Sequence, residues 1–132
     1  MKSISSFKKV INDYEYFLFD QWGVLHNGAN AHQGAADAMA NIKSAGKKII
    51  LVSNSSRRVS ASVDGLTRFG ITADLYDHIL TSGELAWEAI KNQTDPFYRR
   101  LGAKCFIIGN DRREYFLDGL GLNPVRCVKS AD

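Results

Sequence analysis

The sequence predicts an α/β protein with a mainly parallel sheet, and three observations support this fold class. Short apolar runs alternate with longer amphipathic segments along the chain. Two of the amphipathic segments are followed by Gly46 and Gly70, and glycine is common where a helix ends. The run at 47–54 is apolar and β-branched, which is typical of a strand covered on both faces. This alternation predicts βαβ units with right-handed crossovers.

The first half of the chain contains two strands and two helices. Residues 14–20 form an apolar strand that ends at an aspartate. Residues 32–45 are rich in helix formers, and residues 47–54 form the second strand. Residues 57–70 have the spacing of an amphipathic helix.

The second half continues the alternation with shorter elements. Residues 76–82 are a short strand or extended segment, and residues 83–92 form a third helix before Pro96 breaks the pattern. The remaining elements are a strand at 103–110, a helix at 111–120 and a short strand at 124–128.

The composition is that of one ordinary globular domain. The chain has 132 residues, of which 45% are hydrophobic and 23% are charged. Its net charge of +3 is mild, and its basic residues occur in scattered pairs without a long basic run. We therefore expect no nucleic-acid partner.

The cysteines and the N-terminus indicate the compartment. Cys105 and Cys127 lie in apolar, strand-like runs without CxxC spacing, so we interpret them as core thiols in a reducing compartment. The N-terminus lacks the apolar segment of a signal peptide, and no apolar stretch has the length of a membrane span. The sequence predicts a soluble, cytoplasmic protein without a membrane partner.

Two strand ends carry polar residues suited to a ligand site. The first strand ends at Asp20, which is followed by the loop VLHNGAN, and the second ends at Ser53 in the stretch VSNSSRR. In a doubly wound sheet, ligands bind beyond the carboxyl ends of the strands. If the two strands are parallel neighbours, Asp20 and Ser53 lie side by side.

Each part of this pair has a use in phosphoryl transfer. The carboxylate of Asp20 can attack phosphorus, and Mg²⁺ can reduce the repulsion between the two anions. The Ser53 hydroxyl and the free N–H groups at the start of the next helix can hold phosphate oxygens. Arg57 and Arg58 fall in the first turn of that helix, where the macrodipole disfavours cations, and a nearby anion would explain them.

Each of these residues also has an ordinary structural interpretation. Asp20 can serve as a turn or capping residue, and the stretch SNSS can serve as a helix N-cap. Arg57 can belong to a solvated helix face, Trp22 can be a packing residue, and His26 can be a surface residue of a turn. The combination of two such strand ends, with a helix between them, favours the site.

The motifs FLFDQWGVLHNG and ILVSNSSRR together resemble the haloacid dehalogenase (HAD) superfamily, and most closely its class IIA, the 4-nitrophenylphosphatase-like hydrolases. The later segments ILTSGELAWEAI and KCFIIGNDRREYFLDGLG also resemble that class. The resemblance runs from about residue 14 to the end of the chain. It implies an enzyme with a HAD-like, Rossmann-type three-layer sandwich and Mg²⁺-dependent hydrolysis of a small phosphorylated metabolite through an aspartyl-phosphate.

The resemblance also implies roles for individual residues. Asp20 corresponds to the nucleophile and a Mg²⁺ ligand, and the backbone carbonyl of Trp22 to a second Mg²⁺ ligand. Ser53 corresponds to the phosphate-binding residue of the second motif, and Asn54 follows it as is common in the class. Arg57 and His26 are further candidates for contact with the substrate.

The chain departs from the family pattern at Trp22, which stands where the usual acid/base aspartate is found. An indole N–H is only a donor and provides no proton at neutral pH. General acid catalysis contributes about 10²–10⁴-fold, so we expect a slow or altered reaction. The backbone carbonyl is unaffected by this replacement. A related subgroup resembles this sequence in carrying DxWGVLH regularly.

The family's third and fourth motifs are also not found in this sequence. We therefore interpret residues 1–132 as the N-terminal part of a HAD-like core domain, without a complete second domain and with little or no turnover in isolation. In the superfamily's strand order, the first strand would then be a sheet edge with unpaired backbone groups. We expect marginal stability or self-association through that edge.

Two other functions remain open. The chain could be a non-catalytic phosphate- or nucleotide-binding module, or a degenerate relative of the family kept for interaction. A flavodoxin-like or receiver-like domain is less favoured, because FLFDQW lacks the paired acidic cluster of a receiver. No GxGxxG follows a strand, so dinucleotide binding is also poorly supported.

Overall fold

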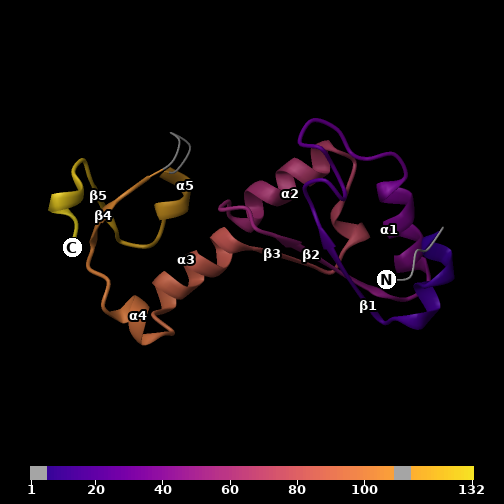
Figure 1. The fold of residues 1–132 in the computed structure, drawn as a ribbon, viewed down its shortest axis with the longest axis horizontal. Coiled ribbons are helices and arrows are strands. Elements are labelled where there is room, and N and C mark those ends of the chain that lie inside the picture. Colours follow the sequence, from indigo (N-terminus) through magenta and orange to yellow (C-terminus); the bar gives the residue numbers. More distant parts are fainter. Residues whose placement is uncertain (1–5, 109–113) are drawn as a thin grey trace.

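A computed structural model describes residues 6–108 and 114–132 of the chain. Three parallel strands form its main sheet in the order β1 (Tyr16–Asp20), β2 (Lys48–Ser53) and β3 (His78–Thr81). Helix α1 (Ala35–Ser44) connects β1 to β2, and α2 (Val59–Arg68) connects β2 to β3 (Figure 1). The predicted α/β fold with parallel strands is confirmed.

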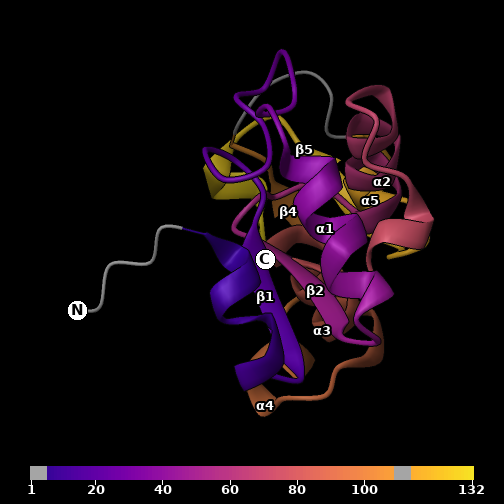
Figure 2. The same cartoon turned by 90° about the vertical axis from the view of Figure 1, so that its right-hand side faces the viewer.

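Both connecting helices lie on the same side of the main sheet (Figure 2). Strands that are added consecutively by right-handed crossovers place their helices on one face. On this face the core contains side chains from both helices and from the strands beneath them. Its fully buried members include Met39 and Ile42 of α1, Leu66 of α2, and Ile49 and Leu51 of β2.

The opposite face of the main sheet is open in the described part of the chain. Leu18 is 66% exposed, Val52 38% and Leu80 44%, and the register places these residues on neighbouring strands. The prediction that the second strand is covered on both faces is therefore wrong for the described residues. The consecutive strand order is the reason, because it leaves one face without a helix.

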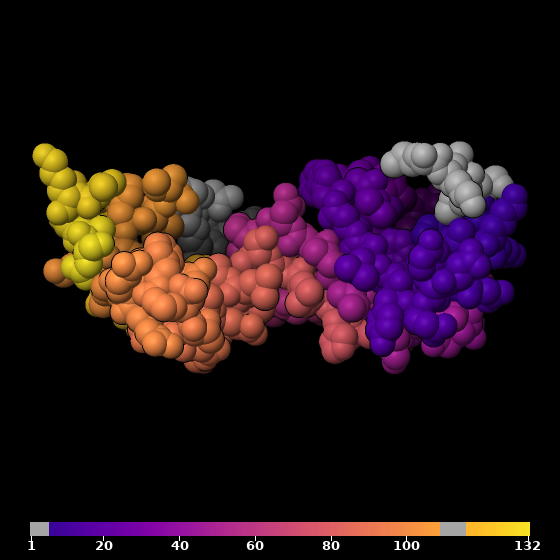
Figure 3. Space-filling view, turned by 60° about the horizontal axis from the view of Figure 1, so that its bottom comes forward, coloured from indigo at the N-terminus to yellow at the C-terminus, as the bar shows by residue number. Residues whose placement is uncertain are grey.

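Helix α3 (Ser82–Asn92) leads from the main sheet to a smaller group of elements at the other end of the elongated molecule (Figures 1 and 3). This group contains α4 (Pro96–Arg99), β4 (Lys104–Phe106), α5 (Glu114–Leu117) and β5 (Asn123–Val125). Four short 3₁₀ helices complete the described elements: η1 (Phe7–Lys9), η2 (Ile11–Asp13), η3 (Ala73–Leu75) and η4 (Val128–Ser130).

Strands β4 and β5 pair in parallel, but they form a separate two-stranded sheet. The prediction of a single sheet is wrong at this point, because α3 starts directly after β3 and carries the chain away from the main sheet. Residues 109–113, predicted as a strand end and a helix start, lie outside the described residues. That residues 1–132 are part of one core domain stays a prediction.

The two cysteines differ in burial. Cys105 in β4 is half-buried and Cys127 is exposed, and both are free thiols. The prediction of a core thiol is wrong for Cys127, because β5 ends at Val125 and Cys127 lies in the surface segment that follows. Within residues 6–108 and 114–132, no helix combines the length and the apolar character that a membrane crossing requires.

Candidate active site

The parallel register brings the two predicted strand ends together. Asp20 is paired with Val52, so Ser53 is the next residue at the same edge of the sheet. The carboxylate of Asp20 is exposed at this edge, and its Oδ1 accepts a hydrogen bond of 2.7 Å from the backbone N–H of Gln21. This short bond restrains the carboxylate at the point where the strand ends.

The loop after β1 is closed by its own backbone hydrogen bonds. The N–H of Gly23 donates to the carbonyl of His26 at 2.7 Å, and the N–H groups of Leu25 and His26 donate to the carbonyl of Gln21 at 2.9 and 3.2 Å. Leu25 is only 3% exposed and anchors the loop in the core. Within the described residues, none of the recorded hydrogen bonds ends on the carbonyl of Trp22.

The indole of Trp22 packs within this loop. Its ring covers Gly28 so closely that a Cβ added at Gly28 would lie 2.3 Å from it, and Gly28 has a left-handed φ of +90°. The side chain is nevertheless 67% exposed and contacts the edge of the His26 ring, with centroids 5.8 Å apart. These contacts support the interpretation of Trp22 as a packing residue of the loop.

His26 lies between the loop and the end of α2. Its ring centroid is 4.8 Å from that of Phe69. Burial lowers the pKa of His26, and the charge of His32 lowers it further, while Asp20 acts in the opposite direction. The imidazole is therefore mainly neutral at pH 7. Its Nδ1 accepts a hydrogen bond of 3.0 Å from the N–H of Gly28, which leaves the proton on Nε2.

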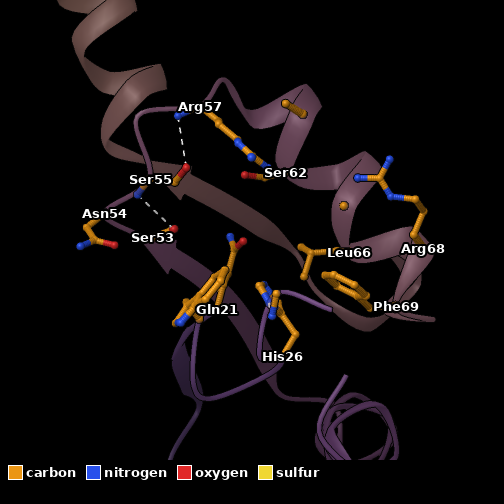
Figure 4. A pocket seen from close by; sticks show the side chains of 14 residues that line it. Gln21, His26, Ser53, Asn54, Ser55, Arg57, Ser62, Leu66, Arg68 and Phe69 are labelled. Atoms are coloured by element: carbon orange, nitrogen blue, oxygen red, sulfur yellow. Dashed lines mark hydrogen bonds between the residues drawn. The ribbon is translucent and has the colours of Figure 1, made fainter. Parts of the chain in front are cut away.

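The segment between β2 and α2 is held by serine side chains. The N–H of Ser55 donates to Ser53 Oγ, and the N–H of Arg57 donates to Ser55 Oγ, both at 3.2 Å (Figure 4). Among the described residues, the N–H of Asn54 has no hydrogen-bond acceptor. These contacts place one unused backbone donor directly after Ser53, at the edge that carries Asp20.

The start of α2 differs from the sequence-based expectation of free N–H groups. The carboxylate of Glu84 in α3 accepts a hydrogen bond of 2.8 Å from the N–H of Val59, the first residue of α2. The same carboxylate accepts two hydrogen bonds from Arg58, at 2.8 and 2.7 Å. This pairing raises the pKa of Arg58 and lowers that of Glu84. The N–H of Val59, which the sequence predicted to be free for a phosphate, is thus already hydrogen-bonded to Glu84.

The two neighbouring arginines therefore have different roles. The guanidinium of Arg58 pairs with Glu84 and lies 3.7 Å from the ring centroid of Trp87. The anion expected near Arg58 is thus the carboxylate of Glu84, and a phosphate is not required to explain the position of Arg58. The guanidinium of Arg57 has no hydrogen bond or ion pair with the described residues and extends from the loop toward Ser62 (Figure 4).

A cavity of about 400 Å³ lies between the loop after β1, the segment after β2 and one face of α2. Its wall contains the predicted site residues His26, Ser53, Asn54 and Arg57, together with Trp22. Asp20 is not part of this wall and lies at the adjacent end of β1. The structure thus joins most of the predicted residues in one cavity beside the exposed carboxylate.

Sequence reasoning missed Gln21, which is only 5% exposed. Its side chain points into the cavity toward Ser62 (Figure 4), and among the described residues its Nε2 has no hydrogen-bond partner. A signal was present in the sequence, because Phe17 and Phe19 precede it at intervals of two on the covered face of the strand. Glu84 was also missed, and no local pattern identifies its contacts with α2.

The oxygen atoms near the end of β1 are of the kind that Mg²⁺ prefers. The exposed Asp20 carboxylate and the Trp22 carbonyl are hard donors, and the carbonyl is free of recorded hydrogen bonds from described residues. These two groups fit a Mg²⁺ ion and would supply part of its coordination. In the described part of the chain, no group of three or more His, Cys, Asp or Glu residues could hold a metal by itself.

Comparison with known proteins gives consistent similarities. The family model for haloacid dehalogenase-like hydrolases matches residues 17–123. A 4-nitrophenylphosphatase of Schizosaccharomyces pombe is 29% identical over 92% of this chain and 40% of its own length. Phosphoglycolate phosphatase 2 of Arabidopsis thaliana is 30% identical over 83% of this chain and 35% of its own length.

A solved structure has a similar fold. A haloacid dehalogenase-like hydrolase from Brucella suis 1330 aligns with a TM-score of 0.75 and 30% identity, over 89% of this chain and 42% of its own chain. The chain thus spans about 40% of the length of the curated phosphatase from Schizosaccharomyces pombe.

Proposed function

Because the chain belongs to the haloacid dehalogenase-like hydrolases, in their class IIA branch, we propose that the protein hydrolyses a small phosphorylated metabolite through an aspartyl-phosphate on Asp20, with very weak turnover by residues 1–132 alone. The observation that carries this proposal is the exposed Asp20 carboxylate beside Ser53 at one sheet edge. The names of the similar proteins, all phosphatases, support the reaction class.

In the proposed reaction, an Asp20 oxygen attacks phosphorus and the bond from phosphorus to the ester oxygen breaks. The alcohol leaves with the bonding electron pair and takes up a proton, and water then hydrolyses the aspartyl-phosphate to regenerate the carboxylate and release phosphate. Ser53 Oγ and the N–H of Asn54 would hold non-bridging oxygens of the phosphoryl group. Asp20 and the Trp22 carbonyl would hold Mg²⁺ in part, and this cation would reduce the repulsion between the Asp20 carboxylate and the phosphoryl group.

The proposal is tested by trapping the covalent intermediate. The chain is incubated with Mg²⁺ and 4-nitrophenyl phosphate, quenched in acid, and its intact mass is measured. We expect a hydroxylamine-sensitive adduct of one phosphoryl group that disappears with Asp20→Asn or with excess EDTA. Asp13→Asn, at an exposed aspartate of η2, is the matched control and should retain the adduct. An adduct that persists in Asp20→Asn, or none at saturating substrate, contradicts the proposal.

A second function is supported by Trp22, because the residue at this position cannot donate a proton to the leaving group. The chain would then bind a phosphate or nucleotide without turnover. This alternative predicts that phosphate binding survives Asp20→Asn and weakens in Ser53→Ala, and that no adduct forms even in the native chain. Calorimetric titration with inorganic phosphate, carried out beside the trapping experiment, separates the two functions.

A further inference from the structure

We propose that the cavity beside Asp20 binds a second anionic group of the substrate, a carboxylate or a second phosphate, while the phosphoryl group that reacts lies over Asp20 and Ser53. This inference rests on the proposed function and specifies its substrate class. It concerns Gln21, Arg57 and Ser62, none of which is needed to explain attack on phosphorus. The cavity volume of about 400 Å³ suits one small organic group.

The first support is the polar inner wall of the cavity. Gln21 is only 5% exposed, yet its side-chain Nε2 has no hydrogen-bond acceptor among the described residues. A buried donor without a partner destabilises the fold, because it has lost its hydrogen bonds to water. Ser62 is also buried, at 8% exposure, and no hydrogen bond of its Oγ is recorded with described residues. An oxygen atom of a ligand would satisfy Gln21 Nε2, and the Ser62 hydroxyl lines the same cavity as a further donor.

The second support is the charge of the wall. The residues that line the cavity include Arg57 and Arg68 but no aspartate or glutamate. Arg57 extends toward Ser62 (Figure 4) and has no partner in the described part of the chain, and Arg68, the last residue of α2, is a second arginine of the wall. A free guanidinium beside neutral donors is suited to an anion, because charged hydrogen bonds are the strong ones.

The third support is continuity with the phosphate end of the site. Ser53 ends β2 beside Asp20 and also lines the cavity. A substrate whose phosphate contacts Ser53 could therefore extend a short distance into the cavity. The rings of His26 and Phe69 lie against each other and form an aromatic side of the wall.

The test uses three probes with the same carbon skeleton. Glycerol 3-phosphate has one anionic group, 3-phosphoglycerate replaces its terminal alcohol with a carboxylate, and glycerol 1,3-bisphosphate adds a second phosphate. Their dissociation constants, and that of inorganic phosphate, are measured by calorimetry in the presence of Mg²⁺. We expect at least one of the two probes with a second anionic group to bind about tenfold more tightly than glycerol 3-phosphate. The preferred probe identifies the second group.

Variants of the cavity wall show which residues cause the preference for a second anionic group. Arg57→Gln and Gln21→Leu should each reduce it about tenfold, while leaving the affinities for glycerol 3-phosphate and inorganic phosphate unchanged. Arg126→Gln removes an exposed arginine outside the cavity wall and is the matched control, which should retain the preference. Thermal melting of each variant checks that the fold is retained, and Arg57→Gln, an exposed residue, covers the case in which Gln21→Leu unfolds.

The outcomes separate this inference from the proposed function. Equal affinity for all three organic probes overturns the second subsite but leaves phosphoryl transfer at Asp20 intact. If Arg57→Gln weakens the binding of all probes equally, the second subsite is also overturned, because Arg57 would then bind the reacting phosphate. If inorganic phosphate and every organic probe fail to bind, both the inference and the proposed function are wrong.

Discussion

Trp22 combines two properties that a carboxylic acid at the same position would not have. Its ring packs on Gly28 and the edge of His26, which stabilises the loop after β1. Its indole cannot protonate a leaving group. His26 does not provide an evident replacement, because burial keeps its imidazole mainly neutral and its Nδ1 already accepts a hydrogen bond. The proposed reaction should therefore depend strongly on how easily the leaving group departs.

This dependence can be measured with Trp22→Asp. The variant should hydrolyse an alkyl phosphate roughly 10²-fold faster than the native chain, because a general acid assists a poor leaving group. Its rate with 4-nitrophenyl phosphate should change much less, since nitrophenolate leaves without a proton. Initial rates of phosphate release with both esters provide the comparison, and Trp22→Phe is the control that keeps an aromatic ring. Equal acceleration of both esters would show that Trp22 acts through loop structure instead.

The connection between α1, β2 and β3 depends on one carboxylate. Asp77, directly before β3, accepts hydrogen bonds from Lys43 of α1 at 2.7 Å, from Lys48 of β2 at 3.0 Å and from the N–H of Ile49 at 2.8 Å. The bond from Lys43 contributes most to holding the pKa of Asp77 far below its ordinary value, followed by the N–H of Ile49 and by Lys48. Asp77 therefore positions three elements of the main sheet.

This pKa shift predicts how stability changes with pH. Because the pKa is depressed in the folded state, the stabilisation is complete above the unfolded pKa of about 3.9 and is lost as pH falls toward the folded pKa. Asp77→Asn should lower the melting temperature at pH 7, and its difference from the native chain should shrink below about pH 4. Thermal melts across this range provide the measurement.

Asp64→Asn, at an exposed aspartate of α2 with no recorded ion pair among the described residues, is the control and should melt like the native chain. A difference between Asp77→Asn and the native chain that stays constant down to the lowest pH would contradict the assignment. In that case the carboxylate would stabilise the fold by packing and not by its charge.

The arrangement of the main sheet leaves both an edge and a face without cover in the described residues. Among the residues that the structure describes, strand β1 pairs only with β2, so its other side has unpaired backbone groups. On the open face, the side chains of Leu18, Val52 and Leu80 are more than one-third exposed. Parallel sheets are normally covered on both faces. These features support the prediction that this chain self-associates through β1 and the adjoining face.

Sedimentation equilibrium of the 132-residue chain tests this prediction. We expect a concentration-dependent dimer that is weakened about tenfold or more by Leu18→Lys, because a leucine side chain contributes about 1.5–3 kcal/mol when it is buried. Asn41→Lys adds the same charge at an exposed position of α1 on the covered side, and should leave association unchanged. A monomer at all concentrations, or equal weakening by both variants, would show that the open face is not the interface.

Much of the fold and of the candidate site follows from local sequence features. Asp20 and Ser53 could be located because each ends an apolar run, and the alternation of elements predicts parallel strands whose ends meet at one edge. Strand periodicity could also have identified Gln21 on the covered face. The helix positions were predicted to within a few residues for α1, α2 and α3, because their residue spacing is a local signal, as are the glycines that follow α1 and α2.

The sequence by itself thus determined the α/β class, the HAD-like family and the residues at the two strand ends. Tertiary structure alone decided that Glu84 caps α2 and pairs with Arg58, which leaves Arg57 free beside the cavity. It also decided that β4 and β5 leave the main sheet and that both early helices cover one face. The physical reason is that these features depend on contacts between residues far apart in the chain, whereas propensity and periodicity act over a few neighbouring residues.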